Sequence, residues 1–450
     1  MPTLREIARA QTAPALDRLR TLVRQPSVAA TGEGIAECAA LVRRTFEETG
    51  ARVSMHRHNG ASPIVIAEFD GARDRTLLFY NHYDVQPADP LNEWTSPPFE
   101  PTVRDGRLFA RGVADNKGDL TSRLAAILAL REAHGRLPAR VKFFVEGEEE
   151  IGSVHFGSYV ERHREALRAD ACIWEFGQRD LKERLQITLG IKGICYVDLE
   201  VTATTRDLHS SLGAIVDGAG NRLAWALASL KDPSTGRVLV PGFYDRVREP
   251  SARELAATRD IPFDEAELMQ LFGVSRFIGG VTGFDALLRL LYQPTCTVCG
   301  LETGYVGPGS KTVLPRRARA KVDFRLVPDQ DPHEIARLVT AHLERLGMGV
   351  SVTVLGAERA YRTNLDDPFV ALVAGVAHEA TGREITLYPT SAGTGPMYDL
   401  GSALGIPIAS VGGGYWGSRG HAPDENIRLA DYEETIYMMA RIVERFAGLP

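Results

Sequence analysis

Residues 76–84 read Thr76-Leu77-Leu78-Phe79-Tyr80-Asn81-His82-Tyr83-Asp84, an apolar run that ends on an imidazole and a carboxylate. Side chains alternate along an extended segment, so His82 and Asp84 should share one face. Similar apolar runs at 63–69, 141–145 and 171–174 alternate with helical patterns. This alternation predicts an α/β layered domain with a largely parallel sheet.

The pattern changes after about Gly193. From there we expect strand, helix, strand, strand, helix and strand at 193–203, 219–231, 295–302, 317–326, 332–347 and 349–355. This order predicts a ferredoxin-like α+β unit. The α/β pattern returns from about residue 360. We therefore expect a discontinuous catalytic domain, residues 1–194 and 358–450, with a lid or dimerisation domain inserted at 195–357.

Length and composition limit the classes of function. A chain of 450 residues is too long for one compact core, and 44% hydrophobic with 24% charged residues is typical of a globular enzyme. The net charge of -6 and the absence of a basic stripe argue against nucleic acid and membrane-surface partners. No signal-peptide core or bilayer-length apolar stretch is present. Five scattered cysteines favour a reducing, cytoplasmic location.

Acidic and imidazole side chains stand where the apolar runs end. They are His82, Asp84, Asp115, the glutamates at 148–150, Glu175, and His421 in a glycine-rich loop. Ligands of α/β sheets bind beyond the carboxyl ends of parallel strands. Imidazole and carboxylate without thiolate are typical of a catalytic zinc or manganese site. Adjacent glutamates can divide the tasks of metal ligand and general base.

Most of these residues lie in four motifs, at 81–87, 94–99, 111–118 and 146–153, whose order along the chain is that of a known family. The chain resembles the co-catalytic zinc peptidases of metallopeptidase family twenty, which includes aminoacylase, carnosine dipeptidase and succinyl-diaminopimelate desuccinylase. The resemblance covers nearly the whole chain. It is strongest to the carnosine-dipeptidase-like branch, which has counterparts of 190–196, 207–210, 309–315 and 325–329.

The resemblance implies two divalent metal ions per subunit, with zinc favoured and manganese or cobalt as alternatives. One ion would be held by His82, Asp115 and Glu175, and the other by Glu150, His421 and the shared Asp115. Glu149 would be the general base for a metal-bridging hydroxide, because the family's base and ligand directly precede an any-residue-Gly-Ser run. Asp84 would orient the ring of His82. Glu175 replaces the Asp expected in the closest branch, which leaves the substrate preference open.

The same resemblance implies substrate-binding residues. His209 would cross a dimer interface and stabilise the oxyanion in the neighbouring subunit. Arg325 would bind the substrate carboxylate by a bidentate pair. Thr394, with the backbone of Gly393 and Gly395, would belong to a substrate-binding loop. The inserted domain would form a homodimer and close over the substrate about hinges near 195 and 357.

We therefore expect a binuclear metal-dependent hydrolase that cleaves the amide bond of dipeptides or short peptides with a free carboxylate. An N-acyl or N-carbamoyl amino acid amidohydrolase is the main alternative. The two differ in whether a pocket acid or carbonyl awaits an α-ammonium group, which the sequence does not show. A catalytically silent scaffold would have lost a ligand or the base, and the sequence retains all of them.

Overall fold

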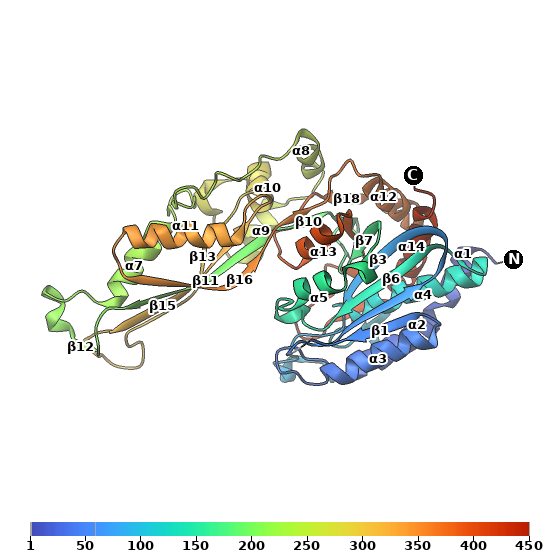
Figure 1. The fold of residues 1–450 in the computed structure, drawn as a ribbon, viewed down its shortest axis with the longest axis horizontal. Helices are drawn as coiled ribbons and strands as arrows, with labels where there is room; N and C mark the ends of the chain where they lie inside the picture. The colour runs from blue at the N-terminus through green and yellow to red at the C-terminus, as the bar shows by residue number, and fades with distance from the viewer. Residues whose placement is uncertain (1, 59, 450) are drawn as a thin grey trace. The chain divides into compact units, whose positions relative to one another are not determined.

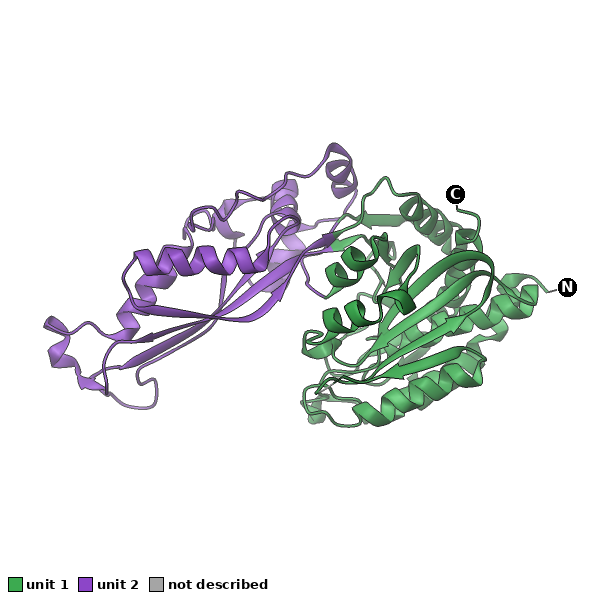
Figure 2. Ribbon diagram, in the orientation of Figure 1, with its two compact units in different colours: residues 1–190, 362–389, 396–450 green, residues 191–361, 390–395 purple. Residues whose placement is uncertain are grey.

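The computed structural model describes residues 2–58 and 60–449 (Figure 1). The described chain divides into two compact units. Unit 1 comprises residues 1–190, 362–389 and 396–450, and unit 2 comprises residues 191–361 and 390–395 (Figure 2). The segment 390–395, which was expected in the second part of the catalytic domain, thus packs in unit 2.

Within the described residues, unit 1 contains a mixed sheet of ten strands. The strand order is β1-β2-β6-β3-β7-β19-β9-β8-β20, and β18 also pairs with β9. The bounds are β1 Arg52–His56, β2 Ile64–Phe69, β3 Gly71–His82, β6 Leu137–Glu146, β7 Ala171–Trp174, β8 Gln178–Arg179, β9 Leu185–Thr188, β18 Ile385–Tyr388, β19 Ile408–Ser410 and β20 Gly414–Tyr415. Neighbours from β6 to β19 run parallel, whereas the β1–β2 and β2–β6 pairs are antiparallel. The expected parallel arrangement therefore applies to the centre of the sheet.

Helices pack against this sheet. They are α1 Leu4–Ala10, α2 Thr12–Arg24, α3 Ile35–Glu48, α4 Lys117–His134, α5 Phe156–Arg162, α6 Arg164–Leu167, α12 Pro368–Thr381, α13 Met397–Leu404 and α14 Leu429–Phe446. Helix α4 contacts β3 and β6 of the sheet and also the helices α1, α2 and α14, so it is buried along most of its length. It ends at Gly135, whose left-handed φ of 75° suits a helix C-terminus.

A small antiparallel sheet of unit 1 has the order β21-β5-β4. Its strands are β4 Thr102–Arg104, β5 Arg107–Phe109 and β21 Asn426–Arg428. Asn426 pairs with Phe109, so residues just before β21 lie beside the chain that follows β5. This pairing brings the surroundings of His421 close to the turn that carries Asp115.

Unit 2 is built on an antiparallel sheet of the order β13-β15-β11-β16. Its elements in chain order are β11 Gly193–Thr202, α7 Ala219–Leu230, β13 Thr297–Thr303, β15 Arg317–Leu326, α11 Pro332–Arg345 and β16 Val350–Glu358, with α8 Ala252–Arg259, α9 Glu265–Phe272 and α10 Gly283–Tyr292 between α7 and β13. The strand, helix, strand, strand, helix, strand order is that of a ferredoxin-like unit. The predicted fold class, a layered α/β domain with an inserted α+β unit, is confirmed.

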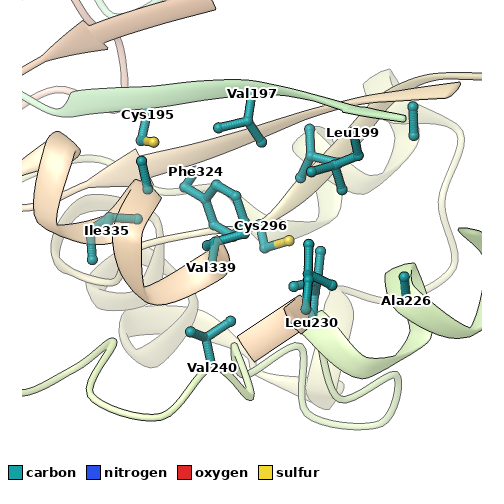
Figure 3. Packing of buried hydrophobic residues seen from close by; sticks show 14 of the residues in the cluster. Cys195, Val197, Leu199, Ala226, Leu230, Val240, Cys296, Phe324, Ile335 and Val339 are labelled. Carbon is teal, nitrogen blue, oxygen red and sulfur yellow. The ribbon is translucent and has the colours of Figure 1, made fainter. Parts of the chain in front are cut away.

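The core of unit 2 lies on one face of its sheet. Strand β11 alternates between buried and half-buried side chains, as expected for a sheet with one covered face. Cys195, Val197 and Leu199 belong to a buried cluster with Phe324 of β15 and Leu230 of α7 (Figure 3). Among all described residues, no helix has both the length and the hydropathy needed to cross a membrane.

Candidate metal centre

The carboxyl ends of three parallel strands bring the predicted ligands to one edge of the sheet. Strand β3 ends at His82, which is in register with Glu146 at the end of β6. Strand β7 pairs with β3 on its other side and ends one residue before Glu175. Beyond β6, the chain forms a short 3₁₀ turn over Glu149–Ile151. The agreement between apolar runs and polar ends in the sequence thus has a direct structural cause.

Asp115 lies between two imidazoles. Its Oδ1 is 2.9 Å from Nε2 of His82, and its Oδ2 is 3.1 Å from Nε2 of His421. Nε2 of His421 is also 3.0 Å from Oε2 of Glu150, and Nε2 of His82 is 3.4 Å from Oε2 of Glu175. The five residues expected as ligands therefore form one continuous cluster, in which each oxygen of Asp115 faces a different side.

The cluster contains two groups of three residues that could each hold a cation. Within each group, the ligand atoms lie within 4.8 Å of one another. One group is Asp115, Glu150 and His421, which coincides with a set expected from the sequence. The other is His82 with Glu149 and Glu150, so the expected base lies among the potential ligands. The sequence predicts a different set around His82, namely Asp115 and Glu175. Both acids contact His82, but these three residues do not form such a group in the described chain.

Burial and mutual repulsion act on the ionisation of this cluster. Burial raises the pKa of Glu149 to about 7, with further increases from the charges of Asp115 and Glu150. Burial and the charge of Glu149 raise the pKa of Glu175 well above its usual range. Hydrogen bonds to Asp115 and Glu150 raise the pKa of His421 to about 10. Ionisation of Glu149 and Glu175 is thus unfavourable in the metal-free protein, whereas hydrogen bonds to His421 and His82 lower the pKa of Asp115. Divalent cations would relieve the repulsion among these acids.

The chemistry of the side chains fits divalent cations. Among the described residues, the buried Oε2 of Glu175 has no hydrogen-bond partner. The His82 ring, 3.4 Å away, is the neighbouring group of opposite charge, and a divalent cation would add a direct partner for this oxygen. The donor set of imidazole nitrogens and carboxylate oxygens suits zinc, manganese or cobalt, and the lack of a thiolate is typical of catalytic rather than structural sites.

Asp84 has a wider role than the expected orientation of His82. Nδ1 of His82 is 3.1 Å from the main-chain oxygen of Asp84 and 3.4 Å from its Oδ1. The Asp84 carboxylate also accepts the backbone N–H of Glu150 at 2.9 Å and that of Glu149 at 3.3 Å. One buried carboxylate thus connects the end of β3 with the turn that carries the expected base.

Glu148 and Arg123 also support the cluster; the sequence shows Glu148 only as a member of the acidic run at 148–150 and gives no sign of Arg123. Glu148 is buried and accepts the backbone N–H groups of Ser62 (2.7 Å) and His155 (3.1 Å). Arg123 of α4 is fully buried and donates to the main-chain oxygens of Tyr80 (2.8 Å) and Trp174 (2.6 Å). These contacts fix the turn before Glu149 and the ends of β3 and β7. In the sequence, a glutamate in an acidic run and an arginine in a helix give no signal of such contacts.

The expected substrate-binding residues belong to unit 2, whereas the cluster belongs to unit 1. Arg325 of β15 donates from Nη1 to Oγ1 of Thr394 at 2.6 Å. Gly395 lies in the same segment, 390–395. His209 ends the short strand β12 (Leu208–His209), is exposed, and its Nδ1 is 2.8 Å from Oγ of Ser211. Arg325 and Thr394 are therefore brought together.

His209 is not brought to this pair within one chain. Arg325 pairs with Ile194 at the start of β11, whereas His209 follows Thr202 at the other end of that strand. A strand of this length separates its ends by roughly 30 Å.

Comparison with known proteins identifies close relatives. A model of peptidase family M20/M25/M40 matches residues 78–445. The Beta-Ala-His dipeptidase of Rattus norvegicus is 32% identical over 395 residues, which cover 83% of this chain and 77% of that protein. The Cys-Gly metallodipeptidase dug1 of Schizosaccharomyces pombe is 30% identical over 347 residues, 73% of this chain and 72% of its own. The solved structure of an M20 family metallo-carboxypeptidase from Sulfolobus solfataricus has a TM-score of 0.92 and 40% identity, and the match covers 97% of this chain and 99% of that chain.

Proposed function

Since this chain belongs to peptidase family M20/M25/M40 and is a metallopeptidase, we propose that it hydrolyses the amide bond of dipeptides or short peptides with a free carboxylate. The observation that carries the proposal is the contact of Asp115 with both His82 and His421, beside the half-buried acid Glu149. Relatives that cover most of this chain are dipeptidases by name, which favours short substrates.

Two divalent cations, zinc first, would occupy the cluster. His82, Asp115 and Glu175 would hold one cation, and Glu150, His421 and the shared Asp115 would hold the other. When bound, such ions polarise a carbonyl group and lower the pKa of water. The orphaned oxygen of Glu175 and the two-sided contacts of Asp115 support this assignment.

Glu149 would act as general base and then as general acid. Its carboxylate accepts a proton from the attacking water and returns it to the leaving amine nitrogen. The position of Glu149 beside the expected ligands Asp115 and Glu150 suits a group that takes up a proton there and gives it back. Asp84 accepts the backbone N–H of Glu149 and thereby limits the movement of the base.

Arg325 and Thr394 would bind the carboxylate of the substrate. The Arg325 side chain is 33% exposed, and its hydrogen bond to Thr394 leaves other N–H groups of the guanidinium for a ligand. Asp323 lies 3.4 Å from Nε of Arg325, on the side away from this bond, and holds the side chain in place. A planar guanidinium binds a carboxylate through two parallel hydrogen bonds.

A homodimer through unit 2 would complete the site, because His209 would act in the neighbouring subunit. In the described chain β13 lies at the end of its sheet, with β15 as its strand neighbour. It exposes Val298 (47%) and Leu301 (61%), an arrangement that a second copy could cover by adding its own strands. The exposed position of His209 agrees with a partner outside its own subunit.

We also propose that the enzyme works in the cytoplasm. All five cysteines, which lie in the described part of the chain, carry free thiols, and Cys299 is exposed. Free thiols persist in a reducing compartment. Cell fractionation would test the location.

A substrate panel tests the function. Metal-free protein is reconstituted with zinc or manganese and given dipeptides, longer peptides, and the matching N-acetyl and N-carbamoyl amino acids. Cleavage of dipeptides, and its loss with a chelator, is the expected result. Cleavage of the acylated amino acids alone would contradict the proposal and assign a deacylase. Release of C-terminal residues from longer peptides would place the enzyme with the carboxypeptidase that it resembles at 40% identity.

A further inference from the structure

Glu425 is a buried carboxylate that binds the turn of Asp115. Its side chain is fully buried. Oε1 accepts the backbone N–H groups of Ala114 (2.8 Å) and Asp115 (3.0 Å). Oε2 accepts the backbone N–H of Gly112 (2.9 Å) and Nη1 of Arg111 (2.8 Å). These four N–H groups of the described chain match the acceptor capacity of an ionised carboxylate.

These hydrogen bonds define the direction of the Asp115 side chain. They fix the main chain on the N-terminal side of Asp115, whose two oxygens face His82 and His421. On the C-terminal side, α4 packs closely on the same turn. A Cβ added to Gly118 would lie 2.2 Å from the main-chain oxygen of Val113. The turn is therefore held between Glu425 and the start of a buried helix.

Glu425 also belongs to the loop that carries the second imidazole. We define the His421 loop as residues 418–426, because the backbone N–H of Asn426 donates to the oxygen of Ser418 at 2.8 Å. His421 and Asp424 have φ values of 63° and 59° in the left-handed region. Such conformations are unfavourable for residues other than glycine and persist where the surroundings fix them. Asp424 accepts N–H and O–H groups of Thr95 at 3.0 and 2.7 Å, so Asp424 and Glu425 together anchor one side of the loop.

We propose that Glu425 is a positioning residue that couples the Asp115 turn to the His421 loop and holds both ligands in place before cations bind. The inference rests on the metal centre of the proposed function. Loss of the carboxylate leaves buried N–H groups without acceptors, and the turn must then move to satisfy them. Removal of a residue that orients a metal ligand weakens metal affinity by a factor of about 10–100.

The test compares Glu425→Gln with Glu254→Gln. Glu254 is also buried and accepts a backbone N–H, that of Ser251, but it lies in unit 2. Zinc affinity is measured by chelator competition, and the geometry of the bound ion by the absorption spectrum of the cobalt-loaded protein. We expect Glu425→Gln to bind at least one ion about 10–100-fold more weakly, with an altered cobalt spectrum. Glu254→Gln should match the wild type in both measurements.

Each result decides between the two claims. If the wild-type protein binds zinc and Glu425→Gln has the same affinity and the same cobalt spectrum, the inference is overturned and the metal centre is left intact. Wild-type protein that binds no cation removes the metal centre and the inference with it.

A second measurement avoids variants that fail to fold. Hydrogen exchange of wild-type protein is followed over 112–115 without metal and with zinc. Protection of these N–H groups in the metal-free protein is expected, because Glu425 already binds them. Protection that arises only on addition of zinc would show that the cation orders the turn, which overturns the inference.

Discussion

Replacement of Glu149 by Gln should separate proton transfer from metal binding. The amide keeps the size of the side chain but cannot accept the proton of the attacking water, so we expect kcat to fall by a factor of about 10²–10⁴. The variant keeps His82, Asp115 and His421, and these residues contact one another without Glu149. It should therefore still bind cations and keep the fold.

The same variant should stabilise the metal-free protein at alkaline pH. Burial raises the pKa of Glu149 from 4.5 to about 7. This difference corresponds to about 3 kcal/mol against the ionised carboxylate in the folded protein. Because the pKa rises on folding, the folded protein keeps the proton at pH 5 and the penalty is small. At pH 9 the carboxylate is ionised and the penalty is complete, whereas Gln carries no charge at either pH.

The assay combines hydrolysis of a dipeptide by zinc-loaded protein with thermal unfolding of metal-free protein at pH 5 and pH 9. Glu161→Gln on the exposed side of α5 is the matched control and should change neither property. Glu149→Gln should unfold at a higher temperature than the wild type at pH 9 and at nearly the same temperature at pH 5. A variant that keeps more than a tenth of the activity would refute the role of Glu149 as base. Equal stabilities at both pH values would refute the repulsion.

Three further predictions concern the charges, the substrate and the dimer. Metal-free protein should lose stability from about pH 6 to pH 9, because folding raises the pKa of three groups. The pKa rises to about 7 for Glu149, to about 8 for the buried Glu146, and to about 10 for His421. In this pH range the folded protein binds more protons than the unfolded protein, so stability falls as the pH rises. Thermal unfolding should show this fall in stability, and added zinc should remove it. Arg325→Met should raise KM for dipeptides about 10–100-fold with a smaller change in kcat, and should not affect the slow hydrolysis of C-terminally amidated dipeptides. The inactive variants His209→Ala and Glu149→Gln are mixed in equal amounts under conditions that exchange subunits. The mixture should regain about a quarter of the wild-type activity, because half of the dimers then hold one complete site out of two. No recovery would contradict a shared site.

The sequence predicts those parts of the fold in which one segment carries its own pattern. The run at 76–84 shows both its burial and its polar end, and β3 ends at His82 as predicted. Other features depend on distant segments. The predicted parallel arrangement does not extend to β1 and β2, because these strands pair antiparallel beside β6.

The candidate site shows the same division. His82, Asp115, Glu150, Glu175 and His421 follow from strand ends and motifs, and the structure places them in one cluster. Their supporting contacts could not be predicted in this way. Arg123 lies in a helix with no polar stripe, and its bonds to the ends of β3 and β7 require the folded sheet.

Glu425 and Glu175 show what distinguishes a support from a ligand. Both are buried acids near Asp115, and a sequence gives both the same letter. Three backbone N–H groups and the Arg111 guanidinium face Glu425 and stabilise its negative charge without a metal ion. By contrast, Oε2 of Glu175 has no hydrogen bond within the described chain, and its neighbours Glu149 and Asp115 carry charge of the same sign. An acid whose surroundings already supply donors orients the main chain, whereas an acid whose surroundings repel its charge requires a cation. This criterion assigns Asp84 and Glu148 to the supports as well, because their carboxylates accept backbone N–H groups.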